Sequence, residues 1–193
     1  MVVNSKESYG YKLESQIREA YGKVLYTMTA HEKQAKTLRW VDNAIKITQI
    51  ILSALTTGSF LTSVIYDKQV ASIVGAILSF VLLVFNLYTK NFTLIEDAKE
   101  HENAGNLLWK VREEYISLLI DFEQLDEKEI VMKRDELQER VYEIYSTTPR
   151  TNAQSYKKAQ TAIKNEAEQS FSEKEIDDVL PDALKRENKK YKD

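Results

Sequence analysis

The sequence has no cysteine, five glycines, two prolines and two histidines among its 193 residues. Without cysteine, the chain can form no disulfide, no thiolate metal site and no cysteine nucleophile. The glycines are isolated and form no phosphate-binding loop, and two histidines are too few for a histidine-rich metal site. The net charge of −3 gives no general attraction to nucleic acid. We therefore expect neither an enzyme, nor a cofactor, nor direct binding of nucleic acid.

Two uncharged stretches of 20 residues stand out, ITQIILSALTTGSFLTSVIY at 47–66 and VASIVGAILSFVLLVFNLYT at 70–89. Twenty helical residues cover about 30 Å, which is the thickness of a hydrocarbon core. The alternative is a pair of buried core helices in a soluble bundle. Such helices usually keep a polar stripe, and the second stretch has almost none. The pattern predicts a transmembrane hairpin closed by the turn at 67–69.

Basic residues near the two spans predict the orientation of this hairpin. Only Lys68 lies in the turn, whereas six basic residues lie within 15 positions of the other span ends: Lys33, Lys36, Arg39, Lys46, Lys90 and Lys99. Loops rich in lysine and arginine stay in the cytoplasm. We expect a multi-pass protein of the cell inner membrane with both termini in the cytoplasm.

Apolar residues recur at helical spacing on both sides of the hairpin. Before it they are Leu13, Ile17, Tyr21, Val24, Met28, Ala35 and Leu38, and after it Ile95, Ala98, Gly105, Leu108, Tyr115, Leu119 and Phe122. We expect the second span to continue into the cytoplasm as one helix that packs antiparallel to the first. Residues 1–46 carry 8 basic and 5 acidic groups (+3), and residues 90–148 carry 8 and 15 (−7). Opposite charges favour this pairing, and two solvated helix faces are the alternative.

Two further helices are predicted from capping signals. Asp126 with Glu129, and Ser172 with Glu175, have the spacing of a capping box. The first helix would carry Ile130, Leu137, Val141 and Ile144 and end before Pro149. The second would be stapled by Phe171 on Ile176, end near Pro181, and dock on the bundle or on a partner through Ile176, Val179, Leu180 and Leu184.

The predicted fold class is all-α, a transmembrane hairpin that continues into a cytoplasmic antiparallel helical bundle. Few glycines and prolines favour this class over a turn-rich β fold. The predicted divisions are an N-terminal cytoplasmic helix (1–46), the hairpin (47–89), cytoplasmic helices (90–148) and a polar segment with one short helix (149–193).

A polar face runs along the first span. It contains Gln49, Ser53, Thr56, Thr57, Ser59 and Ser63, with Phe60 inside it. Such a face can line water between several helices, or it can hydrogen-bond a neighbouring helix or its own backbone. Phe60 is accordingly either a hydrophobic constriction of a pore or a packing residue.

In the second span, Ala71, Gly75 and Ser79 form a row of small residues, which lets helix backbones approach closely. Asn86 lies at nearly the same depth as Gln49. We expect helix packing at these four positions of the second span, with the two amides hydrogen-bonded to each other rather than to an ion.

The two histidines also come to similar depths, because His31 precedes the first span by 16 residues and His101 follows the second by 12. Two interpretations are open. The histidines are either a pair that responds to pH or polar residues of a helix interface, and the second is the more common.

Four segments resemble one known family: YGKVLY at 21–26, EKQA at 32–35, HENAGNLLW at 101–109 and VREEY at 111–115. Together with the two-span layout, they resemble the SLATT family, the SMODS- and SLOG-associating two-transmembrane effector domains. The resemblance covers nearly the whole chain and includes no catalytic residues. It implies a prokaryotic effector of antiviral and other conflict systems that perturbs the membrane and responds to a separate cytoplasmic sensor or nucleotide-signal component.

Two functions therefore compete. The first is a homo-oligomeric effector that opens a pore in the lipid bilayer and causes growth arrest or cell death when triggered. The second is a non-conducting membrane-anchored scaffold whose cytoplasmic helices recruit a partner.

Overall fold

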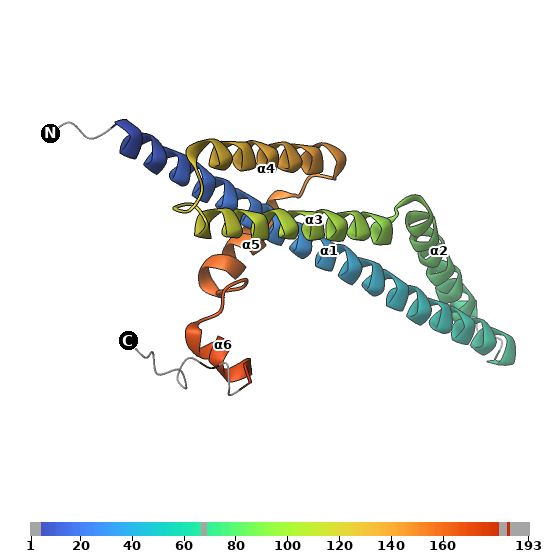
Figure 1. Cartoon of the computed structure of the whole chain (residues 1–193). Coiled ribbons are helices and arrows are strands. Elements are labelled where there is room, and N and C mark those ends of the chain that lie inside the picture. The colour runs from blue at the N-terminus through green and yellow to red at the C-terminus, as the bar shows by residue number, and fades with distance from the viewer. Residues whose placement is uncertain (1–4, 67–68, 182–184, 186–193) are drawn as a thin grey trace.

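The computed structural model describes residues 5–66, 69–181 and 185, and all regular structure within these ranges is helical. The predicted all-α class is therefore confirmed. The helices are α1 (Ser5–Tyr66), α2 (Gln69–Asn91), α3 (Leu94–Ile120), α4 (Glu127–Thr147), α5 (Ala153–Asn165) and α6 (Glu173–Val179) (Figure 1). Residues 67–68 of the predicted turn lie outside the described residues.

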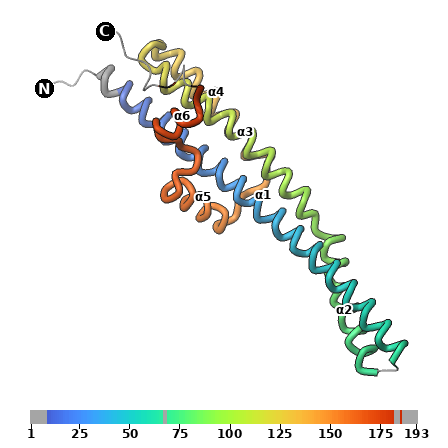
Figure 2. The backbone as a smooth tube through the Cα atoms, turned by 90° about the horizontal axis from the view of Figure 1, so that it is seen from below, coloured from blue at the N-terminus to red at the C-terminus, as the bar shows by residue number. Residues whose placement is uncertain are grey.

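Helix α1 is 62 residues long, which corresponds to about 93 Å at 1.5 Å per residue. It has no break between the predicted cytoplasmic part and the first span. Its C-terminal part lies beside α2 and its middle part beside α3 (Figure 2). One continuous element thus joins the two parts of the molecule.

The second span does not continue into α3 as one unbroken helix, so this expectation was wrong. Helix α2 ends at Asn91, and α3 begins at Leu94 after Thr93, whose φ of −94° and ψ of 55° lie outside the helical region. Asparagine and threonine are weak helix formers because their side chains compete for nearby backbone groups. Asn91 shows this competition, since its Nδ2 donates to the carbonyl oxygen of Leu87 at 2.9 Å.

The core forms where α1, α3 and α4 meet, and α1 and α3 are antiparallel neighbours as predicted (Figure 2). Its buried residues are Leu13, Ile17, Val24, Met28, Leu108, Val111, Tyr115, Leu118, Ile130, Leu137 and Ile144. The apolar stripes read from the sequence supply most of this core. Burial of these stripes, rather than helix propensity alone, holds the helices of the bundle together.

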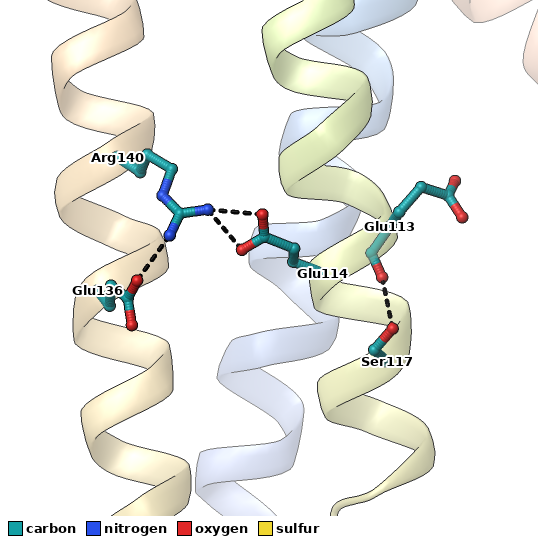
Figure 3. A network of polar contacts seen from close by, with 5 residues as sticks. All are labelled: Glu113, Glu114, Ser117, Glu136 and Arg140. Atoms are coloured by element: carbon teal, nitrogen blue, oxygen red, sulfur yellow. Dashed lines mark hydrogen bonds and ion pairs between the residues drawn. The ribbon is translucent and has the colours of Figure 1, made fainter.

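Ion pairs join α3 to α1 and to α4. Arg39 of α1 donates from Nε and Nη2 to the two carboxylate oxygens of Glu102 on α3, at 2.5 and 2.6 Å. Arg140 of α4 reaches Glu114 of α3 at 2.6 Å and Glu136 of its own helix at 2.6 Å (Figure 3). These side chains are at least one-third exposed, so each pair stabilises the fold little and mainly favours one helix register.

Both capping boxes are present. Glu129 N donates to Asp126 Oδ1 and Asp126 N to Glu129 Oε2, and the equivalent bonds join Ser172 and Glu175. Helix α4 ends before Pro149 and α6 before Pro181, as predicted.

Helix α6 adds no buried side chain to the core, although Leu180, directly after it, is half-buried. Within its described residues it buries no side chain, and the most exposed apolar groups near it are Phe171 (76%) and Val179 (83%). Leu184, which was expected to join this contact, lies outside the described residues.

Helix α5 was missed, since only one short helix was expected after residue 149. Its N-cap Asn152 accepts a hydrogen bond from Ser155 N at 2.8 Å. Ser155, Ala159 and Ala162 are buried, and α5 packs on α1. Small residues of this kind leave no stripe of large apolar side chains to recognise.

The hairpin helices expose apolar side chains on their outer surface, for example Ile50 (69%), Val70 (72%) and Phe80 (67%). Core helices of a soluble bundle would bury these groups. Two helices are long and apolar enough to cross a membrane. Their outward apolar surface matches a lipid environment better than water.

Candidate functional site

Three polar residues of the first span lie against α2. Thr56, Ser59 and Ser63 are half-buried, and the Ser63 hydroxyl is hydrogen-bonded to that of Ser72. Gly75 is buried in the same contact, where an added Cβ would lie 3.4 Å from the Cβ of Ser59. In the single chain, these predicted pore-lining residues therefore occupy the interior of the hairpin.

An amide pair connects the two spans at the end of the hairpin that is nearer the α1–α3–α4 bundle. Gln49 Nε2 donates to Asn86 Oδ1 at 3.0 Å and lies 3.5 Å from Thr89 Oγ1. The equal depth inferred from the sequence thus corresponds to a direct hydrogen bond.

Hydroxyl groups of the first span also bond their own helix. Thr56 Oγ1 donates to Leu52 O at 2.8 Å, and Thr57 Oγ1 donates to Ser53 O at 3.0 Å. These bonds satisfy the hydroxyl protons inside the helix. Threonine at these positions is therefore compatible with lipid as well as with water.

Part of the polar face remains open on the outside of the hairpin. A shallow groove of about 700 Å³ is lined by Lys46, Gln49, Ile50, Ser53, Ala54, Thr57, Leu82 and Asn86. Phe60, which is 66% exposed, also lies outside the α1–α2 contact. The predicted stripe therefore divides into an inner part against α2 and an outer part that contains Ser53 and Phe60.

The row of small residues on α2 divides in a similar way. Ala71 is half-buried and Gly75 buried, whereas Ser79 is exposed. Helical spacing explains this, because a strict four-residue step drifts about 40° around the helix at each repeat. Gly75 is the member of the row that brings the two helices close together.

In the helical bundle outside the hairpin, the two histidines meet between α1 and α3. His31 Nδ1 and His101 Nδ1 lie 2.9 Å apart, and the two residues are 2% and 4% exposed. At Gly105, one turn beyond His101, an added Cβ would make only ordinary contacts, the nearest at 3.6 Å from Glu32 Cγ. The histidines form one buried hydrogen-bonded pair.

Burial keeps this pair uncharged at neutral pH. Burial and, to a smaller extent, the positive charge that His101 can carry together lower the pKa of His31 to about 4. Burial also lowers the pKa of His101, although the nearby carboxylates of Asp97 and Glu100 act in the opposite direction. Two neutral imidazoles can share one Nδ1–H, with one ring as donor and the other as acceptor.

Comparison with known families assigns this architecture. The family model of the SMODS and SLOG-associating 2TM effector domain family 4, SLATT_4, matches residues 13–175. The chain belongs to this SLATT family. No curated protein and no solved structure matches it. The matched range extends from the N-terminal part of α1 into α6, so the hairpin and the histidine pair both lie within the SLATT domain.

SLATT domains are two-transmembrane effector domains and are not a known enzyme family. With two helices that can cross a bilayer, this SLATT chain is a membrane protein with an effector role. The resemblance noted from residues 21–26 and 101–109 is thereby confirmed.

Proposed function

We propose that this SLATT protein is an oligomeric membrane effector of a prokaryotic antiviral or conflict system, and that it opens a polar path across the inner membrane when triggered. The observation that carries the proposal is the groove lined by Gln49, Ser53, Thr57 and Asn86 on the outside of the hairpin. Polar groups in a hydrocarbon environment associate with other polar groups or with water. A second hairpin that covers this groove would provide such an environment.

Several copies are needed because two helices cannot enclose a water-filled path. In a ring of hairpins with the grooves turned inward, Ser53 and Thr57 would contact water and Phe60 would narrow the path. An apolar constriction can close a pore by excluding water. Thr56, Ser59 and Ser63 would reach this path only after α1 turns relative to α2, since they now face that helix.

The proposed orientation places both termini in the cytoplasm, on the basis of the basic residues that flank the spans. The α1–α3–α4 bundle would then receive the trigger from a separate cytoplasmic sensor or nucleotide-signal component. Opening of the pore would arrest growth or kill the host cell.

Ion release from liposomes that contain the purified protein tests the pore. Phe60→Ala should increase the leak because it widens the apolar constriction, whereas Ser53→Leu should reduce it because it dries the path. Thr62→Leu is the matched control, since Thr62 is exposed and lies about 180° around the helix from Ser53. Equal conduction by wild type, Phe60→Ala and Ser53→Leu, with equal insertion, would contradict the proposed path.

The exposed apolar residues in and directly before α6 favour a second candidate function, a scaffold that recruits a cytoplasmic partner. Phe171 and Val179 contact no buried core and are available to another protein. In that case neither hairpin substitution would change ion flux, while Val179→Asp would abolish recruitment.

A further inference from the structure

A second cavity lies in the cytoplasmic part, between α1 and the segment that joins α4 to α5. Its volume is about 360 Å³, within the range of small-ligand sites. It is lined by Thr27, His31, Tyr145, Thr148, Pro149, Arg150 and Thr151. None of these residues is acidic, although residues 90–148 carry a net charge of −7. The lining is therefore suited to a negatively charged ligand.

Most hydroxyl groups of the lining are already used in hydrogen bonds within the protein, which leaves few side-chain donors for a ligand. Three hydroxyl protons are already used: Tyr145 Oη donates to Thr27 Oγ1, Thr27 Oγ1 to Lys23 O, and Thr148 Oγ1 to Ile144 O. Arg150 forms no ion pair with a described residue, and it supplies up to five N–H groups. The donors left for a ligand are Arg150, the hydroxyl of Thr151 and one nitrogen of His31.

The hydrogen bond between the two histidines determines whether His31 can donate a hydrogen bond to a ligand. Its Nδ1 is bonded to His101 Nδ1, so Nε2 is its remaining polar ring atom. In a neutral pair, the ring that donates from Nδ1 has a bare Nε2, and the ring that accepts at Nδ1 carries its proton on Nε2. An anion beside His31 would favour the tautomer in which His31 donates from Nε2 and His101 donates from Nδ1.

We propose that this cavity binds a small phosphate-bearing or carboxylate anion through Arg150, Thr151 and the Nε2–H of His31, and that binding fixes the tautomers of the His31–His101 pair. The pair lies in the α1–α3 contact, so the ligand reaches the interface of the two longest cytoplasmic helices. Other charged groups near the pair are Asp97 and Glu100 of α3, which act on His101 rather than on the cavity. The inference goes beyond the proposed pore and does not require conduction.

Free anions and lipid headgroups share this chemistry, and position favours the free anion. His31 lies 16 residues before the predicted span, or about 24 Å along α1. A headgroup at the bilayer surface would not reach it. We therefore assign the source to the cytoplasm.

Nitrogen-15 NMR of the full chain labelled at histidine tests the proposal, because only two rings contribute signals. Inorganic phosphate is added to the protein in neutral micelles at constant ionic strength and neutral pH. The His31 Nε2 signal should move saturably towards that of a protonated nitrogen, while His101 Nε2 becomes unprotonated. His101→Gln assigns the two rings.

Arg150→Gln should weaken phosphate binding about tenfold, since it removes a charge-assisted hydrogen bond. Arg18→Gln is the matched control, an exposed arginine on α1 that pairs only with Glu14 of its own helix and should leave the titration unchanged. A titration without saturation, or equal binding by wild type and Arg150→Gln, would overturn the site. The same signal change with phosphatidylglycerol vesicles in phosphate-free buffer would overturn the cytoplasmic source.

Discussion

The contact at Gly75 offers a direct test of the hairpin geometry. Gly75 is the buried residue of α2, and a Cβ built on it would lie 3.4 Å from Ser59 Cβ and 3.9 Å from Thr56 O. Gly75→Ala therefore introduces an ordinary contact, and Gly75→Leu introduces three more carbon atoms where no space remains. We expect alanine to be tolerated and leucine to separate the helices.

The magnitude follows from the packing. Overpacking a closely packed contact costs about 1–3 kcal/mol, which changes the ratio of closed to open hairpin roughly 5- to 150-fold. For alanine, the helix propensity gained relative to glycine, about 1 kcal/mol, offsets the tight contact with Ser59. Gly58 is the matched control, because a Cβ there would meet nothing within 4 Å.

Disulfide formation in the membrane measures the separation. The chain contains no cysteine, so Ser63→Cys with Ser72→Cys would give a single reporter pair at two hydroxyls that are now hydrogen-bonded. Oxidation should be several-fold slower with Gly75→Leu than with the parent, Gly75→Ala or Gly58→Leu. Equal rates in all four proteins would refute the contact.

Three further predictions concern the bundle and the topology. The folded-state pKa of His31, about 4, is below its ordinary value of 6.5, so the unfolded chain binds more protons between these values. In urea unfolding, the free energy of unfolding should be highest above pH 6.5 and lower by up to about 3 kcal/mol at pH 4. This decrease should be smaller for His31→Gln. In the same assay, Leu108→Ala should lower the free energy of unfolding by about 2–5 kcal/mol because Leu108 is buried. Leu107→Ala should lower it little because Leu107 is exposed. Gln69→Cys should react with an impermeant thiol reagent from outside the cell, and labelling only after lysis would reverse the orientation.

Local signals were sufficient for much of the fold. The capping boxes at Asp126 and Ser172 each depend on residues three positions apart, so their geometry follows from the sequence itself. The apolar stripes of α1 and α3 predicted an antiparallel contact because a short turn leaves few other arrangements. Similar distances from that turn along the chain were also enough to place Gln49 beside Asn86 and His31 at the level of His101.

Other features depend on tertiary contacts that no local pattern records. The break at residues 92–93 has no proline or glycine, and α5 is held on α1 by Ser155, Ala159 and Ala162. The polar face of the first span was read as one surface because the position of α2 around α1 was unknown. The cavity beside His31 likewise forms only when the segment after α4 returns to α1.

Two helical segments connect the bundle to the turn of the hairpin: α1 is continuous, and the returning segment is divided into α2 and α3. This difference has a mechanical consequence. Helix α1 runs without interruption from His31 to Phe60, about 44 Å along one helix. The returning segment is divided between α2 and α3 at residues 92–93. A continuous helix resists twisting, since its backbone hydrogen bonds connect every turn to the next. We therefore expect a rotation imposed on α1 at the level of the histidines to reach the bilayer as a rotation of the first span. The divided segment would absorb the same rotation at residues 92–93, so torque from the helical bundle would move α1 against α2 instead of turning the hairpin as a rigid body.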